Sequence, residues 1–210
     1  WGWLRERADL TQDANLLMNA LSKEGVIALL DGCLEKAVAV GESLGTMGDE
    51  FGIDLGGQLE KLRVSALPLT LLGRTEEVLG SVDELSDSIR TAGLLEQIQA
   101  WVLAEAGRVE DAVELSDRYM AEGTYGEPED ETRSWTLLII LKTAVLVKDR
   151  ETSRALYCRL TVLSDMALML GQCVARILGG AAALLGNPDT ARSHYLKALE
   201  LMGAIRHRPE

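Results

Sequence analysis

Few residue patterns in this sequence are typical of catalysis. The two histidines, His194 and His207, do not form the zinc-binding His-Glu-x-x-His motif. No Gly-Lys dipeptide occurs, so the phosphate-binding loop Gly-x-x-x-x-Gly-Lys-Ser/Thr is absent. His194 stands beside Tyr195, and His207 stands near the expected end of a helix, where the helix dipole favours a cation. We expect both to be structural residues. The chain is expected not to be an enzyme, any catalytic domain lying outside it.

The cysteines and acidic residues do not have the spacing of known metal sites. Cys33, Cys158 and Cys173 are widely separated, whereas zinc sites and disulfide scaffolds need closely spaced or numerous cysteines. We expect buried free thiols in a reducing compartment. The acidic run Glu127–Glu131 lacks the alternating ligands of a calcium loop and is predicted to be a solvated loop. No metal and no cofactor is expected.

The charge and the apolar content exclude two further classes of protein. The chain has 210 residues, a formal net charge of −12 and 47% hydrophobic residues. This apolar content is sufficient for a packed core, so wholesale disorder is excluded. An acidic chain cannot displace the counterions of duplex nucleic acid, so direct contact with nucleic acid is not expected.

No membrane segment or secretion signal is expected. The most apolar stretch, 166–185, contains Gln172 and Arg176 near its middle, and a central arginine costs about 3 kcal/mol on insertion. We therefore predict a buried helix there. The N-terminus lacks the basic, apolar and small-residue regions of a signal peptide. The expected location is the cytoplasm.

The elements that would position any site are helical. Apolar residues recur at helical spacing, as at Leu10, Leu17 and Leu21, and no Asn-Gly hairpin signal occurs. Segments that can end one helix and begin the next start at residues 32, 73, 107, 148 and 186, about forty residues apart. In the last of these, Gly186 suits a left-handed helix end, Asn187 a helix cap and Pro188 a first helical position.

The sequence thus predicts an all-α fold of about five helix-turn-helix repeats and about ten helices. The predicted repeats cover residues 10–46, 55–91, 94–122, 131–164 and 166–206. Their first helices are predicted at 10–30, 55–72, 94–106, 131–147 and 166–185, and their second helices at 34–45, 75–91, 109–122, 151–164 and 188–206.

The connections and the ends carry further predictions. Pro68 predicts a kink or an early break near Leu67, and the longest loops are expected at 45–57 and 121–131. Two tryptophans near the start, Trp1 and Trp3, are candidates to cover the first hairpin or to belong to a preceding repeat. All 210 residues are predicted to form one solenoid domain, and the absence of an initial Met suggests a fragment of a longer protein.

In its last repeat the chain resembles the tetratricopeptide repeat family. The matching residues are Leu178-Gly179 in the first helix, then Gly186, Ala191, Tyr195 and Ala198. The resemblance implies a right-handed α-α superhelix. It also implies that Gly179 and Ala191 permit close helix contact, and that Tyr195 fills the space between successive hairpins. The tail 191–210 is similar to repeats that follow the ATPase module in large bacterial signal-transduction regulators, including transcriptional activators and nucleotidyl cyclases.

The family's inward positions give the candidate binding residues. They fall on the first helices and form a candidate concave groove of Arg63, Gln97, Trp101, Trp135, Lys142 and Arg176, with Glu60, Thr70, Glu105, Leu138 and Cys173 at further inward positions. Cations and tryptophans together suit an extended acidic peptide. The alternative is that the tryptophans pack between hairpins and the cations pair with neighbouring carboxylates.

Two functions follow as hypotheses. The first is a non-catalytic protein-protein interaction scaffold, acting as the regulatory or sensor arm of a bacterial signal-transduction or transcriptional regulatory protein. Its partner would be a protein, a peptide or another domain of the same polypeptide. The second is a ligand-gated sensor that binds a small molecule between hairpins. Because a solenoid end leaves an apolar face uncovered, a homodimer through the terminal hairpin is also expected.

Overall fold

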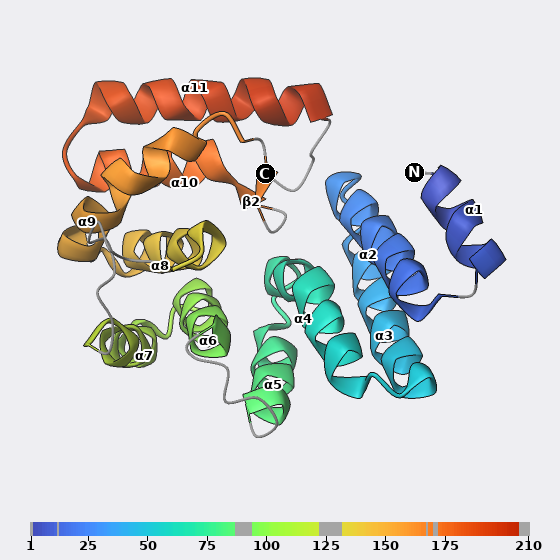
Figure 1. Ribbon diagram of the computed structural model, residues 1–210. Helices are drawn as coiled ribbons and strands as arrows, with labels where there is room; N and C mark the ends of the chain where they lie inside the picture. The colour runs from blue at the N-terminus through green and yellow to red at the C-terminus, as the bar shows by residue number, and fades with distance from the viewer. Residues whose placement is uncertain are drawn as a thin grey trace. The chain divides into compact units, whose positions relative to one another are not determined.

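The computed structural model describes residues 2–11, 13–86, 94–121, 132–166, 168–169 and 172–205. The chain divides into two compact units, which we call unit one and unit two. Unit one consists mainly of residues 1–90 and unit two of residues 91–206 (Figure 1). The described residues are almost entirely helical, so the predicted all-α class is confirmed. The single solenoid domain and the handedness of the superhelix stay predictions.

Unit one contains a short first helix and two helical hairpins. Its helices are α1 (Gly2–Thr11), α2 (Ala14–Leu30), α3 (Leu34–Phe51), α4 (Asp54–Leu71) and α5 (Thr75–Ser86). α3 packs against both α2 and α4, and α2 also contacts α4. Met18, Val40, Leu44 and Val64 form an apolar cluster shared by these three helices. Trp3 is 68% exposed, so it does not cover a hairpin.

The glycine-rich segment 45–57 is a helix crossing, and the prediction of a long loop there is wrong. α3 continues to Phe51, and α4 begins at Asp54. A Cβ atom on Gly57 would lie only 2.6 Å from the Cα atom of Gly48. The glycines are therefore needed because the two backbones touch. Of the kink or early break predicted near Leu67, the break does not occur, because α4 runs through Pro68 to Leu71, and the kink stays a prediction.

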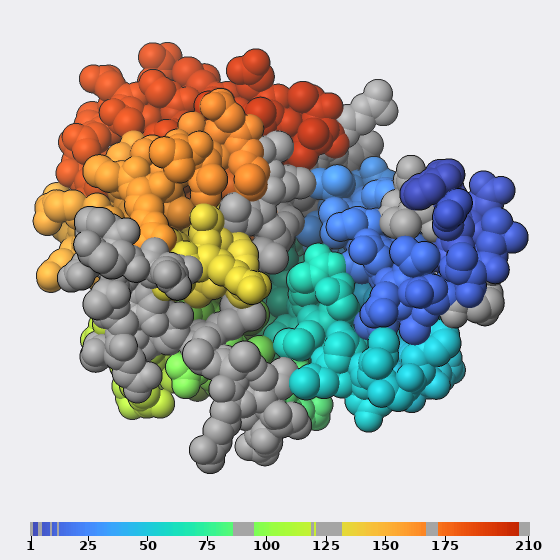
Figure 2. Space-filling model, viewed as in Figure 1, coloured from blue at the N-terminus to red at the C-terminus, as the bar shows by residue number. Residues whose placement is uncertain are grey.

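Unit two contains three further hairpins. Its helices are α6 (Leu94–Glu105), α7 (Val109–Ala121), α8 (Ser134–Val147), α9 (Arg150–Leu160), α10 (Val174–Leu184) and α11 (Pro188–Ile205), with a short 3-10 turn η1 (Thr161–Leu163) after α9. α8 contacts α6, α7, α9 and α10. It is buried at every position from Thr136 to Ala144 and supplies much of the apolar core. In Figure 2 the atoms of α11 lie along those of α10, in agreement with their contacts.

The predicted helix 166–185 is wrong in its first part. Two short antiparallel strands, β1 (Leu168–Met169) and β2 (Gln172–Cys173), precede α10. The helix begins only at Val174, after Cys173 in an extended conformation. Apolar composition alone could not separate a short buried strand from a helix.

The other helix bounds agree with the sequence to within a few residues, because the helix ends were correctly located. Gly32, Gly73, Gly107 and Gly186 all have positive φ, as does Lys148 with φ 62°. These are the five positions at which the repeated segments were predicted to start. A positive φ ends a helix, and glycine adopts it without steric cost.

Gly179 makes a close contact, but with the ring of Tyr195 rather than with a helix backbone, and the place of Tyr195 between successive hairpins stays a prediction. A Cβ atom on Gly179 would lie 2.8 Å from the Tyr195 ring, so the ring packs onto α10 inside its own hairpin. The three cysteines are thiols rather than disulfides, as expected, but Cys33 and Cys158 are exposed and only Cys173 is buried. The predictions for the loop 121–131 and for His207 fall on residues outside those described.

Candidate functional site

Residues of α6, α8 and α10 that were predicted to face inward come together in unit two, in a group that we call the inner cluster. It comprises Trp101, Glu105, Lys142 and Arg176. The Lys142 ammonium lies 2.7 Å from Glu105 Oε1 and 4.4 Å from the centre of the Trp101 ring. Trp101 Nε1 donates to the same carboxylate oxygen at 3.1 Å. Because Trp101 and Glu105 are one helical turn apart, α6 holds both against α8.

The cluster keeps the Glu105 carboxylate charged. Burial acts to raise its pKa, but the charge of Lys142 and the hydrogen bonds from Lys142 and Trp101 outweigh burial. The charge of Arg176 acts in the same direction. The pKa of Glu105 is therefore lowered from its ordinary value. One carboxylate on α6 thus balances cations on both α8 and α10.

One turn before Trp101, α6 buries the side-chain amide of Gln97. Gln97 is fully buried, and neither its Oε1 nor its Nε2 has a hydrogen-bond partner among the described residues. Gln172, just before α10, also buries its Oε1 without a hydrogen-bond partner among the described residues. An unsatisfied buried polar group costs about 1–3 kcal/mol, so such groups are rare in folded proteins.

The six predicted groove residues are distributed over both units. Arg63 lies in unit one on α4 and pairs with Glu60. In unit two, Gln97, Trp101 and Lys142 are buried, Trp135 is half-buried and Arg176 is exposed. A partner on this surface would therefore meet Arg176 and Trp135 first. The acidic-peptide groove stays a prediction, and Leu138, another inward candidate, lies in the apolar core.

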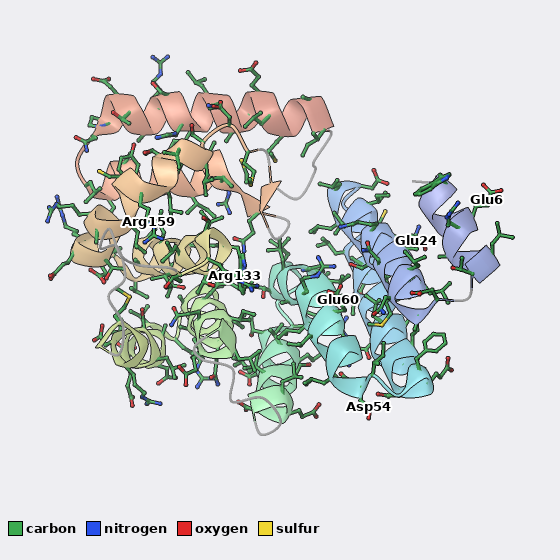
Figure 3. All side chains as sticks on the ribbon, viewed as in Figure 1. Glu6, Glu24, Asp54, Glu60, Arg133 and Arg159 are labelled. Atoms are coloured by element: carbon green, nitrogen blue, oxygen red, sulfur yellow. The ribbon has the colours of Figure 1, made fainter. Side chains whose placement is uncertain are left out.

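Unit one carries a hollow of about 1200 Å³, which we call the unit-one hollow. Side chains of α2, of the turn before α4, of α4 and of the end of α5 line it. The polar members among the described residues are Asn15, Asn19, Ser22, Lys23, Asp54, Gln58, Glu60, Arg63, Ser81 and Glu84. Figure 3 labels Asp54 near the start of α4 and Glu60 further along the same helix. The hollow is large enough for a peptide segment or a small molecule.

An ion pair inside α4 fixes one wall of this hollow. Arg63 Nε donates to Glu60 Oε2 at 3.0 Å, and its Nη2 donates to the buried Ser22 hydroxyl on α2. The bond to Ser22 joins α4 to α2. Glu60 and Arg63 were predicted at inward positions of the second repeat, and both line the hollow.

The amides of the hollow were missed by the sequence analysis. Asn15 and Asn19 are exposed on α2, one turn apart, and Gln58 lies on α4. Each amide offers a donor and an acceptor, which matches the peptide group of a bound chain. A signal was present, because two asparagines at this spacing share one face of a helix.

A serine motif in the sequence is explained by the fold. Gly41-Glu42-Ser43-Leu44-Gly45 has the letters of the Gly-x-Ser-x-Gly nucleophile elbow, a sharp turn from strand to helix. All five residues lie inside α3, and Ser43 Oγ donates to the Ala39 carbonyl at 3.0 Å. The motif is therefore part of a regular helix, and its two glycines face α4.

The described histidine has a structural partner. His194 Nε2 lies 2.9 Å from the hydroxyl of Tyr157, which joins α11 to α9. Burial, with the charge of Lys197, lowers the pKa of His194. Within the described part of the chain no group of His, Cys, Asp and Glu could hold a metal ion.

Two results bear on the class of protein. None of the described helices combines the length and the apolar character needed to cross a membrane. Comparison of the chain with protein-family models, curated proteins and solved structures finds no match in any of the three.

Proposed function

We propose that the chain is a non-catalytic interaction module that binds a segment of a partner protein in the unit-one hollow. The observation that carries the proposal is the hollow itself, lined by consecutive first helices, α2 and α4, and bearing exposed amides. Amide side chains bind the backbone of an extended peptide whatever its sequence, while the apolar lining supplies contact area. The partner is a protein, a peptide or another domain of the same polypeptide.

The amides give the first test. Peptides that bind the full chain are selected from a random display library, and the most enriched one is measured by calorimetry. Replacing both Asn15 and Asn19 with alanine is expected to weaken its binding about tenfold, because two pairs of hydrogen bonds are lost. The matched control is Ser43→Ala with Thr46→Ala, exposed polar residues of α3 that do not line the hollow. Equal losses in both double variants would contradict the proposal.

The biological setting proposed for this module is regulatory. The similarity of the tail 191–210 to repeats of large bacterial signal-transduction regulators supports an arm that senses a partner for an effector domain. Here the resemblance in sequence is the only support, and the cytoplasm is the proposed location. Identifying proteins that copurify with the native gene product tests this. Recovery of no signalling or transcriptional component would count against it.

A small-molecule sensor is a second candidate, favoured by the buried amides of Gln97 and Gln172 in unit two. Their unused hydrogen-bonding groups would be satisfied by a polar ligand that enters between the first helices. A thermal-shift screen against metabolites and nucleotides tests this, with no peptide present.

Replacing Gln97 with methionine tests the same sensor hypothesis by mutation. The apolar side chain has a similar shape and removes an unsatisfied amide, so the free energy of unfolding should rise by about 1–2 kcal/mol. The measurement is urea unfolding followed by circular dichroism. A ligand that stabilises the wild type but not the Gln97→Met variant would identify the sensor. A Gln97→Met variant less stable than the wild type would show that the amide is satisfied.

A further inference from the structure

We propose that the unit-one hollow selects partner segments in which a basic side chain stands beside an apolar one. This inference rests on the proposed function and adds the chemistry of the partner. It reverses the sign of the charge expected from the sequence, where Arg63 indicated an acidic peptide.

The positive charge of Arg63 is already balanced. Its guanidinium is held by the Glu60 carboxylate, with N–O distances of 3.0 Å and 3.1 Å to Nε, and by the Ser22 hydroxyl. An incoming carboxylate would have to displace Glu60, which belongs to the same helix and stays nearby. Arg63 therefore gives an acidic segment little advantage.

The remaining charges of the hollow are unequal. Asp54 and Glu84 contribute two carboxylates, and Lys23 contributes one ammonium. Neither carboxylate forms an ion pair within the part of the chain that the structure describes. With a net charge of −12 on the whole chain, the field at the hollow attracts cations.

Exposed apolar side chains adjoin these carboxylates. Ile53 and Leu55, on either side of Asp54, are 36% and 44% exposed and line the hollow. Met18 and Leu85 form a buried part of its wall. A lysine or arginine next to a leucine, isoleucine or phenylalanine would place its charge by the carboxylates and its neighbour on this apolar surface.

The experiment selects peptides from a random display library against three full-length proteins. They are the wild type, Asp54→Asn with Glu84→Gln, and a control that removes the same charge elsewhere, Asp31→Asn with Glu50→Gln. Asp31 and Glu50 are exposed and do not line the hollow. We expect the wild type and the control to enrich basic-apolar peptides. The dissociation constant of the best one should rise about fivefold in Asp54→Asn with Glu84→Gln, and the rise should shrink in high salt.

The outcomes separate the two proposals. Enrichment of acidic or uncharged peptides, or an equal affinity for all three proteins, would overturn the charge preference and leave the interaction module standing, provided that binding depends on Asn15 and Asn19. If no peptide is enriched by the wild type, the proposed function fails, and the charge preference fails with it.

Discussion

Replacing Gly57 with alanine is expected to lower the free energy of unfolding by about 2–3 kcal/mol. The added Cβ atom would lie 2.6 Å from the Gly48 Cα atom and 3.0 Å from the carbonyl oxygen of Leu44. Both are backbone atoms, so no side chain can rotate to relieve the contact, and α3 and α4 must separate. The higher helix propensity of alanine recovers only about 1 kcal/mol.

The preceding residue provides the control. A Cβ atom on Gly56 would meet nothing within 4 Å, so Gly56→Ala should be neutral or stabilising by up to about 1 kcal/mol. Urea unfolding of the full chain, followed by far-ultraviolet circular dichroism, measures both variants. Similar stabilities for the two variants would show that α3 and α4 do not cross at Gly48 and Gly57.

Replacing Lys142 with alanine is expected to cost about 2–3 kcal/mol. The change removes the partner of a partly buried carboxylate and the cation above the Trp101 ring, and it leaves space beneath α6. The figure lies below that of a fully buried pair because 28% of the Glu105 side chain is exposed. As a control, Arg154→Ala removes an exposed cation of α9 and should change stability by less than about 0.5 kcal/mol.

The dependence on pH distinguishes the lost ion pair from the lost volume. The pKa of Glu105 is lowered in the folded protein, so its contribution is fully present above the ordinary value of 4.5 and is lost as the pH falls through the lowered value. The difference in stability between the wild type and Lys142→Ala should therefore shrink on acidification. A difference that stays constant through this range would mean that the ion pair contributes nothing and that the cost is one of packing.

Helix positions were predictable because their signals are local. Gly32, Gly73, Gly107 and Gly186 each follow an apolar helical pattern, and a left-handed residue ends a helix whatever surrounds it. The segment 45–57 was wrongly predicted to be a loop because glycine has two structural roles. Glycine ends a helix at Gly52, yet at Gly48 and Gly57 it lets two helices touch. The second use depends on a partner helix, which local sequence does not reveal.

For the candidate sites, the sequence supplied residues, and the fold supplied their contacts. The resemblance to tetratricopeptide repeats predicted Trp101, Glu105 and Lys142 at inward positions, and the structure shows that they contact one another. The sequence could not show that Lys142 would be buried and its charge balanced by Glu105, because this ion pair depends on how closely α6 approaches α8. The unit-one hollow was missed for the same reason, since an empty space is made by several helices together.

By itself, the sequence determined the helical class, the places where most helices begin and end, and the acidic charge, because all three follow from residue type and short spacing. Only the tertiary structure decided which glycines are contacts, which cations are already paired and where a hollow remains. These depend on distances between residues far apart in the chain, and such distances are set by the packing of whole helices.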